Sequence, residues 1–73
     1  MKKKISLVWF RHPRPGIHYA HHRGRVILLH GFPKATRSAR EFEVYDGRTR
    51  VGLIRGLNAA MTYAEKHLAD LEE

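Results

Sequence analysis

The stretch "REFEVYDGRTRVGLI", residues 40–54, decides the fold of this chain. Apolar and charged side chains alternate on both sides of Asp46-Gly47, and this dipeptide is typical of a two-residue hairpin turn. Pairing about the dipeptide predicts three cross-strand pairs: Phe42 with Val51, Val44 with Thr49, and Glu43 with Arg50. The stretch therefore predicts a β-hairpin with one apolar and one charged face.

This register divides the hairpin into two sets of side chains. The apolar set is Phe42, Val44, Val51 and Leu53. The charged set is Glu41, Glu43, Arg48 and Arg50. Because each glutamate lies near an arginine across the strands, we interpret Glu41 and Glu43 as cross-strand partners, not as a catalytic carboxylate pair.

The preceding residues predict further strands. "ISLVWF", residues 5–10, is rich in β-branched and aromatic residues, and "RHPRPG" ends this strand near Arg11. "IHYAHH" and "RVILLHGF" flank Arg23-Gly24 and predict a second hairpin. Residues 26–29 are apolar on both faces, which indicates a central strand.

The chain ends in a predicted helix. Asn58 is a suitable N-cap, and one side of the helix carries Leu57, Met61, Ala64, Leu68 and Leu71 at a spacing of three to four residues. We therefore expect an α+β fold, a small four-stranded, mainly antiparallel sheet with one C-terminal helix packed on one face. The 73 residues form a single domain, with basic strands over 1–40 and the hairpin and helix over 41–73.

Charge is divided unevenly along the chain. Residues 1–40 carry ten Lys and Arg and no acidic residue, whereas residues 41–73 carry four Lys and Arg and seven Asp and Glu, so +10 and −3 give +7. Such a basic half attracts phosphate backbones or an acidic protein surface. The chain has no cysteine, and its apolar run over 5–10 is too short for a signal core or a membrane span. We expect a cytoplasmic protein with no membrane partner.

The segment "HPRPGIHYAHHRGR", residues 12–25, holds four of the six histidines and no acidic residue. Zinc needs three or four converging ligands, and these histidines have no cysteine and no nearby carboxylate, so we predict no metal and no cofactor. No nucleophile motif or phosphate-binding glycine loop is present. We interpret the segment and its flank as a cationic docking surface, with these partner-binding residues: Arg11, Arg14, His18, His21, His22, Arg23 and Arg25.

Two alternatives involve RNA. "RVILLHGFPKAT", residues 25–36, resembles the central strand and following loop of the messenger-RNA-cleaving toxins of the RelE/HigB superfamily, although Ala35 replaces the second lysine of their motif. This resemblance implies that Lys34, Arg37 and Arg40 contact RNA. A general nucleic-acid-binding module would stack bases on Trp9, Phe10 and Tyr19. Its phosphate contacts would be Arg11, Arg14, Arg23, Arg25, Lys34, Arg37 and Arg40.

A second resemblance covers the whole chain. "MKKKISLVWFRHPRPGIHYAHH", residues 1–22, and "EFEVYDGRTRVGLIRGLNAAMTYAEKHL", residues 41–68, are similar to the small transcription regulators of lytic Xanthomonas phages. This resemblance implies a protein that is not an enzyme. It implies binding to host RNA polymerase at the N-terminal part of the β′ subunit, near the RNA exit channel, with inhibition of σ-dependent initiation and read-through of terminators.

Overall fold

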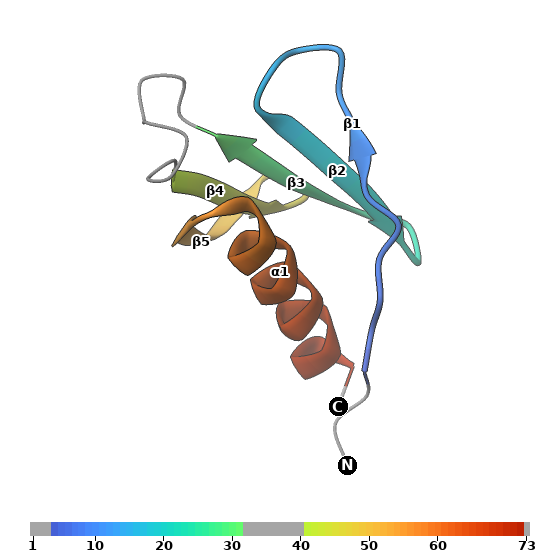
Figure 1. Ribbon diagram of the computed structural model, residues 1–73. Coiled ribbons are helices and arrows are strands. Elements are labelled where there is room, and N and C mark those ends of the chain that lie inside the picture. Colours follow the sequence, from blue (N-terminus) through green and yellow to red (C-terminus); the bar gives the residue numbers. More distant parts are fainter. Residues whose placement is uncertain (1–3, 32–40, 73) are drawn as a thin grey trace.

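The computed structural model describes residues 4–31 and 41–72, which form an antiparallel sheet and one helix (Figure 1). The elements are β1 (Phe10–Arg11), β2 (Ile17–His22), β3 (Arg25–Gly31), β4 (Glu41–Asp46), β5 (Thr49–Arg55) and α1 (Leu57–Leu71). The strands lie in the order β1-β2-β3-β4-β5, with β3 in the centre as predicted. This arrangement confirms the α+β class and the C-terminal helix.

The predicted number of four strands is wrong, because the described part of the chain contains five. The two hairpins supply four strands. The fifth, β1, is a two-residue edge strand in which Phe10 lies opposite Tyr19 and Arg11 lies opposite His18. The apolar run over 5–10 therefore contributes only its last residue to the sheet.

The hairpin of β2 and β3 confirms the predicted turn at Arg23-Gly24. His22 lies opposite Arg25, so these two residues alone connect the strands. Arg23 has φ 49 and Gly24 has φ 81, and positive φ at both central residues is characteristic of a type I′ turn. The twist of this turn matches that of the two strands, which fixes the register of the hairpin.

The register predicted for the hairpin of β4 and β5 is wrong. Gly47, with φ 64, and Arg48 form the turn, so that Asp46 lies opposite Thr49. Between the next pairs, β5 has one extra residue, Val51. The resulting pairs are Tyr45 with Arg50, Val44 with Gly52, Glu43 with Leu53, and Phe42 with Ile54. The bulge reverses the alternation beyond it, which places Leu53 on the face away from the helix, where 47% of its surface is exposed.

The core lies between the sheet and α1, which packs against β3, β4 and β5. Figure 1 shows the helix on one side of the sheet. The sheet buries Ile27, Leu29, Phe42 and Val44, and the helix buries Ala60, Ala64, Leu68 and Ala69. Because three of the four buried helix residues are alanines, the helix backbone approaches the sheet closely.

The helix begins two residues earlier than Asn58 would require as an N-cap, so that part of the prediction is wrong. Gly56 is the N-cap, and its φ of 92 turns the chain from β5 directly into Leu57. Leu71, predicted on the buried side, is 51% exposed at the last turn. Within the described residues, no helix is long and apolar enough to cross a membrane.

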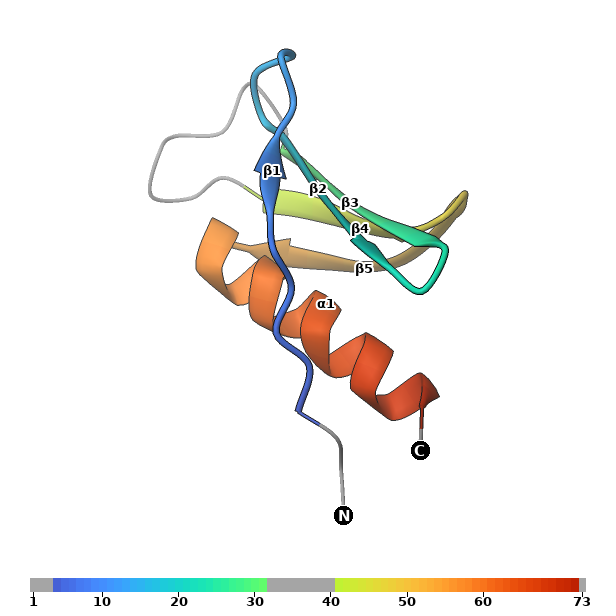
Figure 2. The ribbon, with the colours of Figure 1, turned by 90° about the vertical axis from the view of Figure 1, so that its right-hand side faces the viewer.

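Residues 4–9 run beside α1 (Figure 2) and complete the core. Ile5, Leu7 and Trp9 pack against the buried cluster, while the residues between them are exposed. The backbone N–H of Leu7 donates to the carboxylate of Glu65 at 2.9 Å. The strand predicted over residues 5–10 from its β-branched and aromatic content is therefore wrong before Phe10, because the segment packs beside the helix.

Candidate functional site

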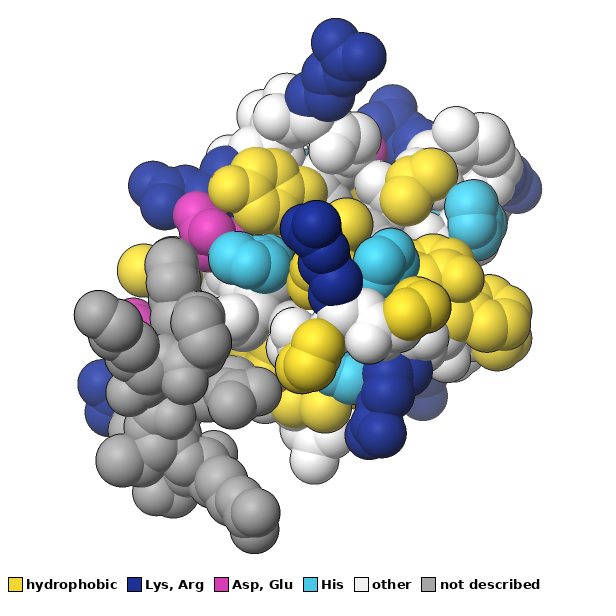
Figure 3. All heavy atoms as spheres, turned by 90° about the horizontal axis from the view of Figure 1, so that it is seen from above, with side chains coloured by type: hydrophobic (Ala, Val, Ile, Leu, Met, Phe, Trp, Pro, Cys, Tyr) yellow, Lys and Arg dark blue, Asp and Glu magenta, His cyan; other side chains and the backbone are white. Residues whose placement is uncertain are grey.

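The sheet has one face covered by α1 and one open face, which Figure 3 shows from above. Alternation along the paired strands places on the open face Phe10, Ile17, Tyr19, His21, Val26, Leu28, His30, Glu43, Tyr45, Arg50 and Leu53. Phe10, Val26 and Leu53 are among its exposed hydrophobic residues. Hydrophobic, cationic and histidine side chains are therefore mixed on one broad surface.

Four aromatic rings gather on the β1–β2 half of this face, and we call them the ring cluster: Phe10, His12, Tyr19 and His21. The rings of Phe10 and Tyr19 stack, with centroids 5.6 Å apart and planes at 26°. His12 and His21 approach Tyr19 edge-on, at 6.3 Å and 5.7 Å. The register of β1 against β2 produces this arrangement, since Phe10 lies opposite Tyr19. Phe10 remains 48% exposed, so the stack ends in a ring accessible to solvent.

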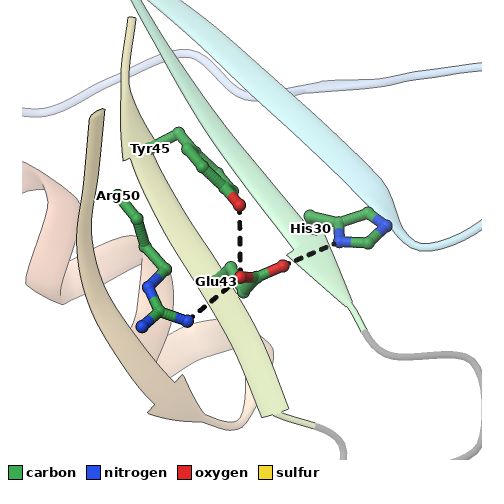
Figure 4. A network of polar contacts seen from close by, with 4 residues as sticks. All are labelled: His30, Glu43, Tyr45 and Arg50. Atoms are coloured by element: carbon green, nitrogen blue, oxygen red, sulfur yellow. Dashed lines mark hydrogen bonds and ion pairs between the residues drawn. The ribbon is translucent and has the colours of Figure 1, made fainter. Parts of the chain in front are cut away.

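The β4 side of the face carries a polar network centred on Glu43 (Figure 4). Its carboxylate lies 3.2 Å from His30 Nδ1 and accepts hydrogen bonds from the Tyr45 hydroxyl at 3.1 Å and from Arg50 at 3.2 Å. The predicted contact between Glu43 and Arg50 is thus present, although Arg50 stands opposite Tyr45.

The chemistry of Glu43 favours a structural role. The hydrogen bond with His30 lowers its pKa most, desolvation opposes this, and Tyr45 and Arg50 lower the pKa further. Desolvation, followed by the hydrogen bond to Glu43 and then the negative charge of Glu43, raises the pKa of Tyr45. A general base works best with a pKa near the ambient pH, so the lowered pKa of Glu43 makes it a weak base. Its three partners stabilise the ionised carboxylate and join β3, β4 and β5.

Arg11, Arg14 and His18, three of the predicted partner-binding residues, lie at the β1–β2 end of the sheet. A hollow of about 420 Å³ opens there, lined by Arg11, His12, Pro13, Pro15, Gly16 and His18. The backbone N–H of Arg14 donates to His12 Nδ1 at 3.0 Å, which holds the loop against the ring cluster. Desolvation, with a smaller contribution from the charge of Arg11, lowers the pKa of His18. The lowered pKa favours the neutral form of the His18 ring.

Three other predicted residues lie at the opposite end of β2 and bind carboxylates of the chain itself. His22 Nε2 lies 3.0 Å from Glu72, Arg23 lies 3.1 Å from the same oxygen, and Arg25 lies 2.8 Å from Asp46. Asp46 also contacts His67 of α1 at 3.1 Å. These contacts tie the two hairpin turns to the C-terminal part of the helix.

The seven predicted residues thus do not form one patch. Strand β2 has six residues, which at about 3.3 Å each separates its ends by roughly 17–20 Å. His21 stands on the open face between the two ends. The ring cluster was not predicted as a unit, because it requires the register between Phe10 and Tyr19, which the sequence did not provide.

Some predicted residues cannot be placed. Lys34, Arg37 and Arg40 lie outside the described residues. Over 4–31 and 41–72, no group of three or more histidine, aspartate or glutamate side chains could hold a metal ion.

Neither a protein-family model, nor a curated protein, nor a solved structure matches this chain.

Proposed function

We propose that the protein is a non-enzymatic phage regulator that binds the RNA polymerase of its bacterial host. It docks on the N-terminal region of the β′ subunit near the RNA exit channel. There it inhibits σ-dependent initiation and promotes read-through of terminators. The resemblance of residues 1–22 and 41–68 to the phage regulators supports this function.

One physical observation carries the proposal: the first forty residues contain ten cations and no carboxylate. A surface whose charges have one sign accelerates encounter with a surface of the opposite charge, and it orients the two molecules as they meet. The RNA exit region combines acidic protein surface with emerging RNA. A basic protein of this size suits such a location.

The docking end is the one that carries Arg11 and Arg14. Arg23 and Arg25 are already paired with Glu72 and Asp46, whereas over 4–31 and 41–72 no ion pair is found for Arg11 or Arg14. Their charges are free to meet carboxylates of a partner without breaking a contact within the fold. We therefore expect this end to contribute most of the electrostatic attraction.

The test is binding of the intact protein to the isolated β′ N-terminal region, with Arg11→Glu/Arg14→Glu as the variant. The matched control is Arg48→Glu, since Arg48 is exposed at the turn of β4 and β5, away from the docking end. We expect the double variant to bind several-fold more weakly and the control to bind like the wild type. Equal binding by the double variant and the wild type would locate the docking surface elsewhere.

Salt dependence separates this contact from attraction to free nucleic acid. Binding to phosphates falls steeply with added salt because counterions are released, whereas a specific protein contact falls less. We expect binding to the β′ region to persist at a salt concentration that abolishes binding to free DNA. If the wild type binds only nucleic acid, the polymerase function is wrong. Capture of ribosomes with cleaved messenger, lost in Lys34→Ala or Arg37→Ala, would favour the toxin function.

A further inference from the structure

The docking proposed above uses the cations Arg11 and Arg14 and assigns no role to the side chains on the open face of β1–β3. Its side chains are aromatic, aliphatic or histidine, and residues 4–31 contain no carboxylate. Glu43, the nearest acidic group on β4, is held by His30, Tyr45 and Arg50. This half therefore offers rings and apolar surface without a nearby free negative charge.

We propose that the open face over β1–β3 binds single-stranded nucleic acid by stacking bases on the ring cluster, with Phe10 as the outermost ring. Phe10 already stacks on Tyr19, so a base placed on the exposed surface of Phe10 extends an existing stack. His12 and His21, edge-on to Tyr19, hold that ring in place and supply ring nitrogens that hydrogen-bond to base edges. Stacking of this kind accepts any base, because every base has a π-face.

Phosphates find positive charge beside the rings. Arg14 is exposed, and its backbone N–H donates to the His12 ring of the cluster, so the loop residue that carries this charge lies next to the ring cluster. Arg11 is also exposed at this end, although alternation from Phe10 directs its side chain to the other face of the sheet. A cation and stacking rings thus lie close together at the β1–β2 end, whereas the β4–β5 half carries Glu41 and Glu43.

The geometry favours separated strands over a duplex. Bases in a duplex stack on each other and leave no free face for Phe10, whereas unpaired bases can splay onto a flat sheet. An extended strand also follows a surface in which rings and cations lie side by side. The same chemistry fits RNA and single-stranded DNA, so both are used as probes.

The experiment measures fluorescence anisotropy of labelled oligouridine, oligothymidine and a DNA duplex, each of about twelve nucleotides, with the purified full-length protein. We expect both single strands to bind more tightly than the duplex. Phe10→Leu keeps the apolar character of the side chain and removes its π-system. Loss of one stacked base predicts about 5- to 150-fold weaker binding of the single strands.

Leu53→Ala is the matched control, because Leu53 and Phe10 are exposed to a similar extent on the same face, at 47% and 48%, and Leu53 lies on β5. It should bind the single strands within about twofold of the wild type, a difference below 0.5 kcal/mol that is expected of a surface change. Arg14→Gln should reduce the slope of log affinity against log salt by about 0.7, the value for one phosphate of a single strand. Circular dichroism of each variant verifies that the fold is kept.

Two results would overturn the proposal. The first is a wild type that binds duplex as tightly as single strands. The second is Phe10→Leu binding single strands like the wild type. If Phe10→Leu then also weakens binding to the β′ region, this face is a protein-docking surface. Neither overturning result depends on the Arg11→Glu/Arg14→Glu variant, so the two proposals fail separately.

Discussion

Gly52 is the position where one added methyl group most directly tests the packing of α1 on the sheet. A Cβ built there would lie 2.6 Å from Cε1 of Tyr63 and 2.9 Å from its hydroxyl oxygen. That hydroxyl donates a hydrogen bond of 2.6 Å to the carbonyl of Val51. Gly52 does not have a positive φ, so the backbone itself accepts alanine. Gly52→Ala therefore forces the tyrosine ring away from the position it occupies.

Three contributions set the change in the free energy of unfolding that Gly52→Ala causes. Overpacking costs about 1–3 kcal/mol, and loss of the Tyr63 hydrogen bond costs about 0.5–1.5 kcal/mol. Replacing glycine by alanine at a compatible φ stabilises the folded protein by about 0.4–1 kcal/mol, because the unfolded chain loses conformational freedom. We expect Gly52→Ala to lower the free energy of unfolding by about 2 kcal/mol, the centre of these terms.

The assay is urea unfolding followed by circular dichroism, in a double-mutant cycle with Tyr63→Ala. Once the ring is removed, the same Gly52→Ala change should raise the free energy of unfolding by about 0.4–1 kcal/mol, so the sign of its effect reverses. Tyr63→Phe is the control, since it keeps the ring and Gly52→Ala should still destabilise. A stabilising effect in the wild type, or equal effects in both backgrounds, would refute the contact.

Three further predictions concern pH, the N-terminal segment and metal. Because the folded-state pKa of Glu43 lies below its ordinary value, its contribution to stability is present above the ordinary value and is lost as pH falls through the lowered pKa. Glu43→Gln should therefore flatten the acid loss of stability, measured by urea unfolding across a pH series. Glu65→Ala removes the acceptor of the Leu7 N–H, and hydrogen exchange at Leu7 should accelerate while exchange in β3 is unchanged. Zinc or a chelator should leave the melting temperature unchanged, and a zinc-dependent rise would reveal a metal site.

The two hairpins show how far local sequence determines register. Arg23-Gly24 forms a type I′ turn through its own backbone conformation, and the predicted hairpin is confirmed. At Asp46-Gly47 the alternation was recognised but the register was wrong. In the predicted register, Gly52 would face away from the helix. The bulge at Val51 brings Gly52 under Tyr63, where only a residue without a side chain fits, so the helix decides the register.

The basic segment shows a second limit of the sequence. We interpreted His22, Arg23 and Arg25 as partner contacts, but each meets a carboxylate from 21 to 50 residues away. A signal for this pairing was present: Glu72 stands at the C-terminal end of a helix, where a negative charge opposes the helix dipole unless cations offset it. His22 and Arg23 provide that offset. An acidic residue in an unfavourable local position therefore indicates a long-range partner.

These internal ion pairs are the reason why we propose docking at the end that carries Arg11 and Arg14. Glu72 and Asp46 offset the charges of Arg23 and Arg25 at one end of β2, whereas Arg11 and Arg14 at the other end have no such offset within the described residues. The ring cluster lies beside that end, because Phe10 pairs with Tyr19 next to the pair of Arg11 and His18, whose side chains point to the other face. The proposed docking and the proposed stacking therefore involve neighbouring parts of the sheet. Removing the Arg14 charge should change salt dependence, and removing the Phe10 ring should change affinity at every salt concentration, so two measurements separate the two contributions.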